Sequence, residues 1–241
     1  QQPGTVVVLE NLRFQKGEKA NDQAFAESLT EFADVYVNDA FGVSHRVAAS
    51  VDAAARRFDR EARAAGLLLR REMSELRRLI DAPIKPFVAI VGGAKVSDKI
   101  TVMHHLLRRV DKLLIGGAMA YTFLQAQGHG VGDSRVEEDR IADAAKLLER
   151  AARQGVEVLL PSDHVAAADF AAGAQPVAVH GEAIPAGLMG LDIGPTTRAR
   201  YCAAIEDAKT VFWNGPMGVF EWEAFAAGTQ AVAAAVAASS A

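Results

Sequence analysis

Two lysines stand between an apolar strand and a helix in the segment AIVGGAKVSDKITVMHHLLRRV, residues 89–110. Lys95 precedes the expected helix, and Lys99 falls in its first turn. A helix N-terminus carries a partial positive charge, so a lysine there costs about a few tenths of a kcal/mol unless an anion lies nearby. The glycines and the two cations therefore predict a binding site for a negatively charged ligand. For this loop alone, two solvated surface lysines are the alternative.

Two arginines form a second basic pair. Arg13 follows the strand expected in TVVVLENLRF, and Arg46 follows the strand expected in DVYVNDAF. If these strands are neighbours, the two guanidinium groups converge, and their planar shape suits carboxylate and phosphate oxygens. Each arginine alone would more often form a surface salt bridge. Together with the lysine loop, the arginines suggest two anion sites on two domains.

Other kinds of chemistry find little support. The segment GGAKVSDK lacks the Walker A spacing, and no G-x-G-x-x-G fingerprint is present, so a dinucleotide dehydrogenase fits only the alternation of elements. His104 and His105 are adjacent on a helix and point apart, and we expect the other four histidines at the surface without a metal. Cys202 has no evident activating partner, and no G-x-S-x-G motif occurs. The basic residues instead indicate catalysis by positioning the reactants and neutralising their charge, which is how phosphoryl transfer is catalysed.

The elements that position these residues alternate along the chain. Short apolar strands between helices of about ten to fifteen residues predict an α/β fold with parallel sheets, whose ligands bind beyond the carboxyl ends of the strands. We expect helices over residues 52–64 and 67–80, the second ended by the prolines of APIKPF. The predicted organisation is a first domain over 1–66, an interdomain helix over 67–80 and a second domain over 81–241.

Composition narrows the class of protein. The 241 residues are 50% hydrophobic and 23% charged, with a net charge of -4, which argues against nucleic-acid or membrane partners. One cysteine excludes a disulfide framework and favours a reducing compartment, so we expect a cytoplasmic protein. No apolar run reaches the roughly 18 residues of a membrane span. Because the chain lacks an initial methionine, we expect the middle part of a longer protein.

Six segments carry a more specific signal. They are LENLRF, VYVNDAFGVSHR, VGGAKVSDKI, LIGGAMAYTFL, GLMGLDIGP and VFWNGPMGVFEWEAF. In this order they resemble the signature segments of the phosphoglycerate kinase family, and the resemblance extends over essentially the whole chain. It implies two Rossmann-like parallel-sheet domains joined by a long interdomain helix, in a monomeric glycolytic enzyme with hinge closure. The implied reaction transfers a phosphoryl group reversibly between 1,3-bisphosphoglycerate and ADP, giving 3-phosphoglycerate and ATP.

The resemblance also implies roles for single residues. Arg13 and Arg46 would bind the triose phosphate in the first domain. Lys95 would be the catalytic residue that steadies the transferring phosphoryl group. In the second domain, Lys99 and Asn214 would contact the nucleotide phosphates, and Glu221 would hold the ribose hydroxyls. The adenine slot would be formed by Gly93, Ala94, Gly117, Gly190, Leu191 and Val219.

Some family segments have no counterpart in the sequence. These include amino-terminal segments that contact the triose phosphate and a glycine-rich GGGD segment whose aspartate is the usual magnesium partner. We therefore expect no metal ligand among these residues, with Mg²⁺ bound through the nucleotide phosphates. The alternative function is a truncated relative that binds a nucleotide without catalysis.

Overall fold

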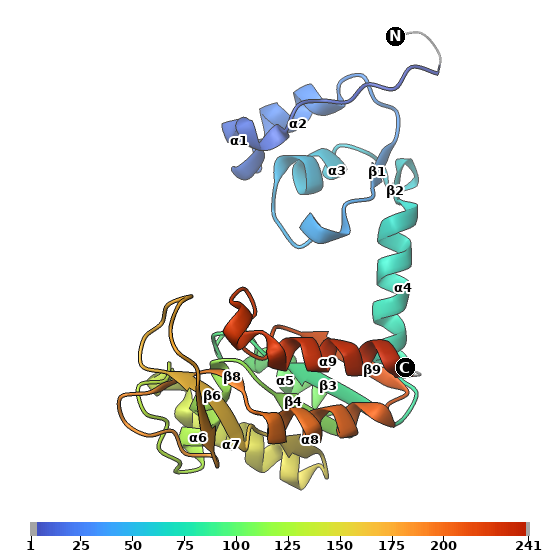
Figure 1. Cartoon of the computed structure of the whole chain (residues 1–241). Helices are drawn as coiled ribbons and strands as arrows, with labels where there is room; N and C mark the ends of the chain where they lie inside the picture. Colours follow the sequence, from blue (N-terminus) through green and yellow to red (C-terminus); the bar gives the residue numbers. More distant parts are fainter. Residues whose placement is uncertain (1–3, 240–241) are drawn as a thin grey trace. The chain divides into compact units, whose positions relative to one another are not determined.

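The computed structural model describes residues 4–239, and the chain divides into two compact units, Gln1–Arg78 and Leu79–Ala241. The division falls within helix α4, Leu67–Asp81, which is drawn in turquoise in Figure 1. Only Leu69 of this helix is buried, and Leu76 and Ile80 are exposed. The long helix expected at this place is therefore present, and it is largely solvated along its length.

The first unit is small and built mainly from short helices. Strands β1, Tyr36–Asn38, and β2, Arg63–Ala65, form a two-stranded parallel sheet. Its core consists of the alanines Ala26, Ala49, Ala53 and Ala54, against which Phe25 and Tyr36 pack. The helices are η1 Leu12–Phe14, α1 Lys16–Lys19, α2 Gln23–Thr30, η2 Phe41–Val43, η3 Ala49–Ala53, α3 Ala54–Arg56 and η4 Arg60–Ala62.

Two predictions for the first unit are wrong. The segment TVVVLENLRF contains no strand, and Val6 and Val8 are 85% and 89% exposed. A strand needs a partner, and no described strand pairs with this segment. The helix expected over 52–64 ends at Arg56, and residues 63–65 form a strand that pairs with β1. In both cases tertiary pairing decides the outcome and local propensity does not.

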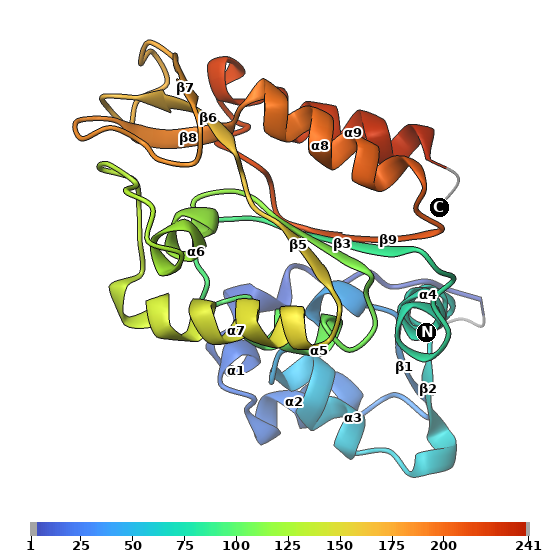
Figure 2. The same ribbon diagram turned by 90° about the horizontal axis from the view of Figure 1, so that it is seen from below.

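The second unit is a parallel sheet covered by helices on both faces. The strand order is β5–β4–β3–β9, with all pairs parallel and all five residues of the central strand β3 buried. Figure 2 shows α8 and α9 on one face of the sheet and α5, α6 and α7 on the other. The strands are β3 Phe87–Val91, β4 Lys112–Ile115, β5 Glu157–Leu159 and β9 Thr210–Asn214. The helices are α5 Ile100–Leu106, α6 Met119–Ala126, η5 Glu138–Arg140, α7 Ile141–Arg153, α8 Pro195–Glu206, η6 Glu223–Phe225 and α9 Ala227–Ala238.

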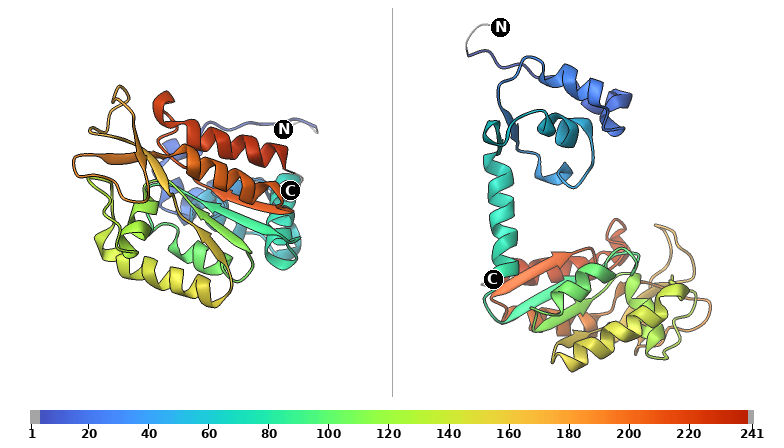
Figure 3. Two further views of the ribbon diagram at one scale, coloured as in Figure 1. Left: turned by 60° about the horizontal axis from the view of Figure 1, so that its bottom comes forward. Right: turned by 180° about the vertical axis from the view of Figure 1, so that it is seen from behind.

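The two faces of this sheet bury separate cores, as the period-two alternation of strand side chains requires. Phe87, Ala89 and Val91 of β3 pack with the helices of one face, and Val88 and Ile90 pack with those of the other. Both views in Figure 3 show the strands running side by side within this layer. The α/β class with parallel sheets is therefore confirmed, and the carboxyl ends of β3, β4 and β9 lie at one edge.

A second, antiparallel sheet was not expected. It has the order β7–β6–β8 and is formed by β6 Asp163–Ala167, β7 Val177–His180 and β8 Met189–Ile193. Only three residues separate β5 from β6, whereas a parallel crossover needs about a dozen, so β6 leaves the main sheet. One prediction about the histidines is also wrong. His164 of β6 is not at the surface but 1% exposed, and burial lowers its pKa.

In the part of the chain that the structure describes, no helix has the length and apolar character needed to cross a membrane.

Candidate active site

The carboxyl ends of three parallel strands meet through glycine backbone. A Cβ atom on Gly92 would lie 2.1 Å from the carbonyl oxygen of Pro216, and one on Gly215 would lie 2.2 Å from the oxygen of Gly92. Gly93 and Gly117 have φ angles of 115° and 68°, in the left-handed region that favours glycine. Only glycine permits this close approach, and the result is a surface made of backbone where side chains would otherwise stand.

A cavity of about 490 Å³ lies over this surface, and we call it the glycine cavity. Its lining consists of Gly93, Ala94, Gly117, Ala118, Tyr121, Asp133, Arg135, Phe170, Met189, Gly190, Leu191, Pro216, Gly218, Val219 and Glu221. All six residues predicted for the adenine slot belong to this lining, and so does Glu221. The fold thus brings together seven residues that are spread over about half of the chain.

The wall of the glycine cavity is attached to the main chain of β8 by hydrogen bonds. The backbone N–H of Val219 donates to the carbonyl oxygen of Leu191 at 2.9 Å. The N–H of Gly190 donates to Oγ of Ser134, also at 2.9 Å, and Ser134 is buried. The segments that contain Ser134 and Val219 are therefore anchored to the same short strand.

Asp192 supports this wall from behind. Its carboxylate accepts hydrogen bonds from the backbone N–H of Gly228 at 2.7 Å and of Ile193 at 2.9 Å. A Cβ on Gly218 would lie 2.4 Å from Oδ1 of Asp192, so this cavity-lining glycine packs directly on the carboxylate. Asp192 is 1% exposed, and burial raises its pKa to about 6.

The two lysines have different surroundings. Lys99 is the N-cap of α5, so it lies directly before the helix and not in its first turn as predicted. Its Nζ donates to Oδ1 of Asn214, the last residue of β9.

Lys95 is exposed and lies near Glu137. Burial alone would raise the pKa of Glu137, but hydrogen bonds from Ser97 and the charge of Lys95 lower it on balance. Lys95, Lys99 and Asn214 stand outside the lining of the glycine cavity.

The first unit has its own cavity of about 490 Å³, which we call the arginine cavity. Its lining consists of Asn11, Leu12, Arg13, Glu18, Lys19, Val43, Arg46, Val47, Ala48, Ser50 and Val51. Arg13 and Arg46 thus line the same cavity, although Arg13 belongs to a short 3-10 helix and not to a strand end. Among residues 4–239 neither arginine forms an ion pair.

A buried carboxylate lies in the wall of the arginine cavity. Glu18 is 6% exposed and accepts hydrogen bonds from Oγ of Ser50 at 2.7 Å and from the backbone N–H of Ser50 at 3.0 Å. Ser50 therefore satisfies this carboxylate, and the two arginines keep their donors for another acceptor. Sequence reasoning missed Glu18, because nothing in KGEK distinguishes it from a surface glutamate.

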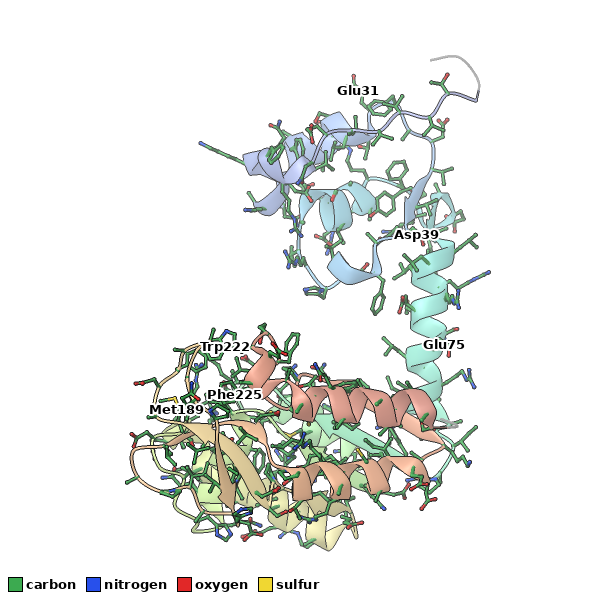
Figure 4. The ribbon with its side chains drawn as sticks, viewed as in Figure 1. Glu31, Asp39, Glu75, Met189, Trp222 and Phe225 are labelled. Atoms are coloured by element: carbon green, nitrogen blue, oxygen red, sulfur yellow. The ribbon has the colours of Figure 1, made fainter. Side chains whose placement is uncertain are left out.

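Several residues of the glycine cavity were also missed. Tyr121, Met189 and Pro216 lie in the quoted motifs beside predicted residues, so sequence proximity could have found them. Phe170, Asp133 and Arg135 lie in loops that carry no motif. The ring of Phe170 packs on Trp222 with centroids 4.7 Å apart. Figure 4 shows Met189, Trp222 and Phe225 gathered at one end of the second unit.

The described side chains form no obvious metal site. Across residues 4–239, no three histidine, cysteine, aspartate or glutamate side chains come close enough together to hold a metal ion. These residues therefore do not fit a magnesium site made of protein ligands alone.

Comparisons with known proteins agree with the six motifs. A family profile described as phosphoglycerate kinase matches residues 1–241. The chain is 55% identical over 236 residues to a phosphoglycerate kinase of Moorella thermoacetica, covering 98% of the chain and 59% of that relative. It is 51% identical to a phosphoglycerate kinase of Clostridium novyi, covering 97% of the chain and 58% of the relative. The chain thus spans about three fifths of the length of these curated relatives.

Solved structures show the same likeness. The structure of phosphoglycerate kinase from Coxiella burnetii matches with a TM-score of 0.87 and 40% identity, covering 100% of this chain and 61% of that one. The structure of phosphoglycerate kinase from Pyrococcus horikoshii matches with a TM-score of 0.82 and 30% identity, covering 99% of this chain and 61% of that one. Because sequence and structure agree from the first residues to the last, the chain belongs to the phosphoglycerate kinase family.

Proposed function

We propose that the protein carrying this chain is a phosphoglycerate kinase, which transfers a phosphoryl group between 1,3-bisphosphoglycerate and ADP to give 3-phosphoglycerate and ATP. The observation that carries the proposal is the glycine cavity, in which seven residues predicted to bind a nucleotide line one space at the strand ends. Ligands of open α/β sheets bind at this edge.

The nucleotide would lie in the glycine cavity. A backbone surface without side chains lets a flat base approach closely, and the carboxylate of Glu221 can accept hydrogen bonds from both ribose hydroxyls. The phosphates would reach Lys99 and Asn214, whose mutual contact holds the ammonium group at the end of β9. A bound polyphosphate supplies the negative charge that makes a cation favourable at this position.

Lys95 would act on the transferring phosphoryl group. It is exposed and near the end of β3, so its ammonium can balance charge on the equatorial oxygens. In the forward direction the bond between phosphorus and the acyl oxygen breaks, and a bond to a β-phosphate oxygen of ADP forms. No hydroxyl proton has to be removed, so the reaction requires alignment and charge neutralisation and no general base.

The triose phosphate would lie in the arginine cavity. 3-Phosphoglycerate carries a carboxylate and a phosphate, and both groups suit the planar guanidinium of arginine. Arg13 and Arg46 both line this cavity, and neither is neutralised by an ion pair among the described residues. Because the two substrates would bind to different units, transfer would need a hinge closure that excludes water.

The remaining proposals concern magnesium and the setting of the reaction. Mg²⁺, when bound, would neutralise charge on the nucleotide phosphates and be held through their oxygens, with its protein ligand expected in the glycine-rich family segment that has no counterpart in this sequence. A single cysteine and a net charge of -4 support a cytoplasmic protein without nucleic-acid or membrane partners. The monomeric state remains a proposal from the family resemblance.

A coupled assay of ATP formation tests the proposal. Purified protein containing the whole chain is mixed with 1,3-bisphosphoglycerate, ADP and Mg²⁺, and ATP production is followed over time. We expect turnover that requires both substrates and is abolished by EDTA. ADP binding without turnover would favour the non-catalytic nucleotide-binding relative, and the absence of both would refute the proposed function.

A further inference from the structure

A glutamate from a distant loop holds the segment that carries Lys95. The carboxylate of Glu137 accepts one hydrogen bond from the backbone N–H of Ser97 at 3.1 Å and another from Oγ of Ser97 at 2.7 Å. The two residues are 40 positions apart in the sequence. Hydrogen bonds to an ionised acceptor are about twice as strong as those between neutral groups. Glu137 therefore fixes the loop at a point just after Lys95.

Glu137 is itself attached to the core of the second unit. Its backbone N–H donates to Oγ1 of Thr122 at 3.1 Å, and Thr122 is a 1% exposed residue of α6. Its carbonyl oxygen accepts a hydrogen bond from the backbone N–H of Arg140 at 2.9 Å. The carboxylate thus has a defined position relative to a buried helix, and through Ser97 it gives the loop the same reference point.

The chain is anchored on both sides of Lys95. Val96 is 0% exposed, and its carbonyl oxygen accepts a hydrogen bond from the backbone N–H of Ile100 at 2.8 Å. On the other side, the carbonyl oxygen of Gly93 accepts a hydrogen bond from the backbone N–H of Met119 at 3.0 Å. The exposed side chain of Lys95 therefore projects from a backbone that is fixed before and after it.

The carboxylate of Glu137 does not neutralise Lys95 by direct contact. Within the part of the chain that the structure describes, Lys95 forms no ion pair. Both oxygens of the carboxylate are instead used by Ser97, so the ammonium group keeps its donors for a ligand. A negative charge acting directly on a phosphoryl group would repel it. A favourable effect of Glu137 on the reaction must therefore come from its hold on the loop.

We propose that Glu137 is a positioning residue for phosphoryl transfer and that it acts through Lys95. By holding Ser97, it keeps the ammonium group of Lys95 within reach of the equatorial oxygens of the transferring group, where alignment determines the rate. The carboxylate itself touches neither substrate. This inference rests on the proposed function, and within it on the role of Lys95.

Steady-state kinetics of ATP formation with varied ADP test the inference. Glu137→Ala should lower kcat about tenfold, which is less than the roughly hundredfold that a misplacement of about 1 Å can cost. The KM for ADP should change less than about twofold, because Glu137 is outside the glycine cavity. Glu137→Gln keeps an oxygen that can accept a hydrogen bond from Ser97, and kcat should stay within about threefold of the unmodified value. Glu138→Ala, the neighbouring exposed glutamate, is the matched control and should change neither constant.

A double-mutant cycle distinguishes positioning of Lys95 from a general structural role. In the Lys95→Ala background, Glu137→Ala should change kcat less than about twofold, because the side chain through which Glu137 acts is then absent. Amide hydrogen exchange gives a readout that does not depend on activity. The N–H of Ser97 should exchange faster in Glu137→Ala than in the unmodified protein, because it has lost its acceptor.

The outcomes separate this inference from the proposed function. The inference is wrong if Glu137→Ala leaves kcat or the exchange of the Ser97 amide unchanged, or if it lowers kcat equally with and without Lys95. It is also wrong if Glu137→Gln loses as much activity as Glu137→Ala, because the charge and not the hydrogen bonds would then matter. In these cases the unmodified protein still forms ATP, and the proposed function stands. If the unmodified protein forms no ATP, the proposed function fails and this inference fails with it.

Discussion

The two candidate cavities have similar volumes but are built in different ways. The glycine cavity rests on a four-stranded parallel sheet whose central strand is fully buried. The arginine cavity is formed by short helices and turns around a core of four alanines. A sheet fixes the ends of its strands through hydrogen bonds and packing on two faces, whereas short turns depend on a few local bonds. We therefore expect substitutions of residues that line the glycine cavity to lower stability strongly. In the arginine cavity we expect mainly the loss of charged side chains to matter, through weaker ligand binding.

The largest expected effect lies at the reacting group. Lys95→Ala should lower kcat about a hundred- to a thousandfold, because charge stabilisation of a transition state is worth roughly 2.7–4 kcal/mol. The KM for ADP should change little, because the contact strengthens mainly in the transition state. Steady-state kinetics with varied ADP measure both constants. Lys146→Ala, an exposed lysine on α7, is the control. A normal kcat with weakened ADP binding would reassign Lys95 to ground-state binding.

The residues of the glycine cavity were predicted through the family resemblance, and for the glycines among them there is also a physical reason. Gly93 and Gly117 follow strand ends with positive φ, and Gly190, near the start of β8, packs against the ring of Tyr121 where a Cβ has no room. Asp133 and Arg135 carry no such signal, because their position depends on a buried serine that anchors a loop to a strand 56 residues away in sequence. Loop placement of this kind cannot be obtained from residue type or spacing.

The errors in the fold have the same origin. Residues 5–9 have the composition of a strand, but a strand exists only where a partner strand pairs with it. Residues 63–65 have a helical composition but pair with β1. Strand β6 was not predicted, although it begins only three residues after β5, where the chain turns out of the main sheet. Strand pairing is a property of the whole fold, so a local pattern cannot determine it.

The buried Asp192 should make the stability of the second unit depend on pH. Its folded pKa of about 6 exceeds the ordinary 3.8 by about 2 units, so the folded state holds the proton more tightly. The contribution of this group to the unfolding free energy is therefore complete below about pH 4 and is lost as the pH rises through 6. At 1.36 kcal/mol per pKa unit, the loss amounts to up to about 3 kcal/mol. Asp192→Asn removes this dependence, although it also removes one hydrogen-bond acceptor.

Urea unfolding at pH 4 and pH 7 measures this effect. Trp213 and Trp222 are the only two tryptophans and both lie in the second unit, so their fluorescence reports its unfolding. We expect the unfolding free energy of Asp192→Asn, relative to the unmodified protein, to increase between pH 4 and pH 7. The comparison isolates Asp192 from Asp163, whose lowered pKa acts in the opposite direction. A difference that stays constant with pH would show that Asp192 titrates normally.

A pair of glycine substitutions compares the rigidity of the two units. Gly92→Ala places a Cβ against the backbone of Pro216, which cannot move without separating two paired strands, and should lower stability by about 1–3 kcal/mol. Gly42→Ala in the first unit meets no atom within 4 Å and should change stability by less than about 0.5 kcal/mol. Far-UV circular dichroism during urea unfolding measures both. Equal losses would contradict the stricter packing of the glycine cavity.

The smallest expected effects separate the ligands of the two cavities. Arg46→Ala should raise the Kd for 3-phosphoglycerate about tenfold, because one charge-assisted contact is worth roughly 1.5–3 kcal/mol and the arginine is exposed. It should leave the Kd for ADP unchanged, since Arg46 lines only the arginine cavity of the two. Glu221→Ala should weaken ADP by several-fold, through lost hydrogen bonds to the ribose, and leave 3-phosphoglycerate unaffected.

Calorimetry with each ligand against each variant measures these four changes in affinity. Glu223→Ala, an exposed glutamate two residues from Glu221 and outside the glycine cavity, controls for the loss of a charge in that segment. Arg56→Ala, an exposed arginine of the first unit outside the arginine cavity, serves the same purpose for Arg46. If Arg46→Ala and Glu221→Ala each weakened both ligands to the same extent, the two cavities would not be separate binding sites. The division of substrates between the sheet-based unit and the turn-based unit would then be wrong.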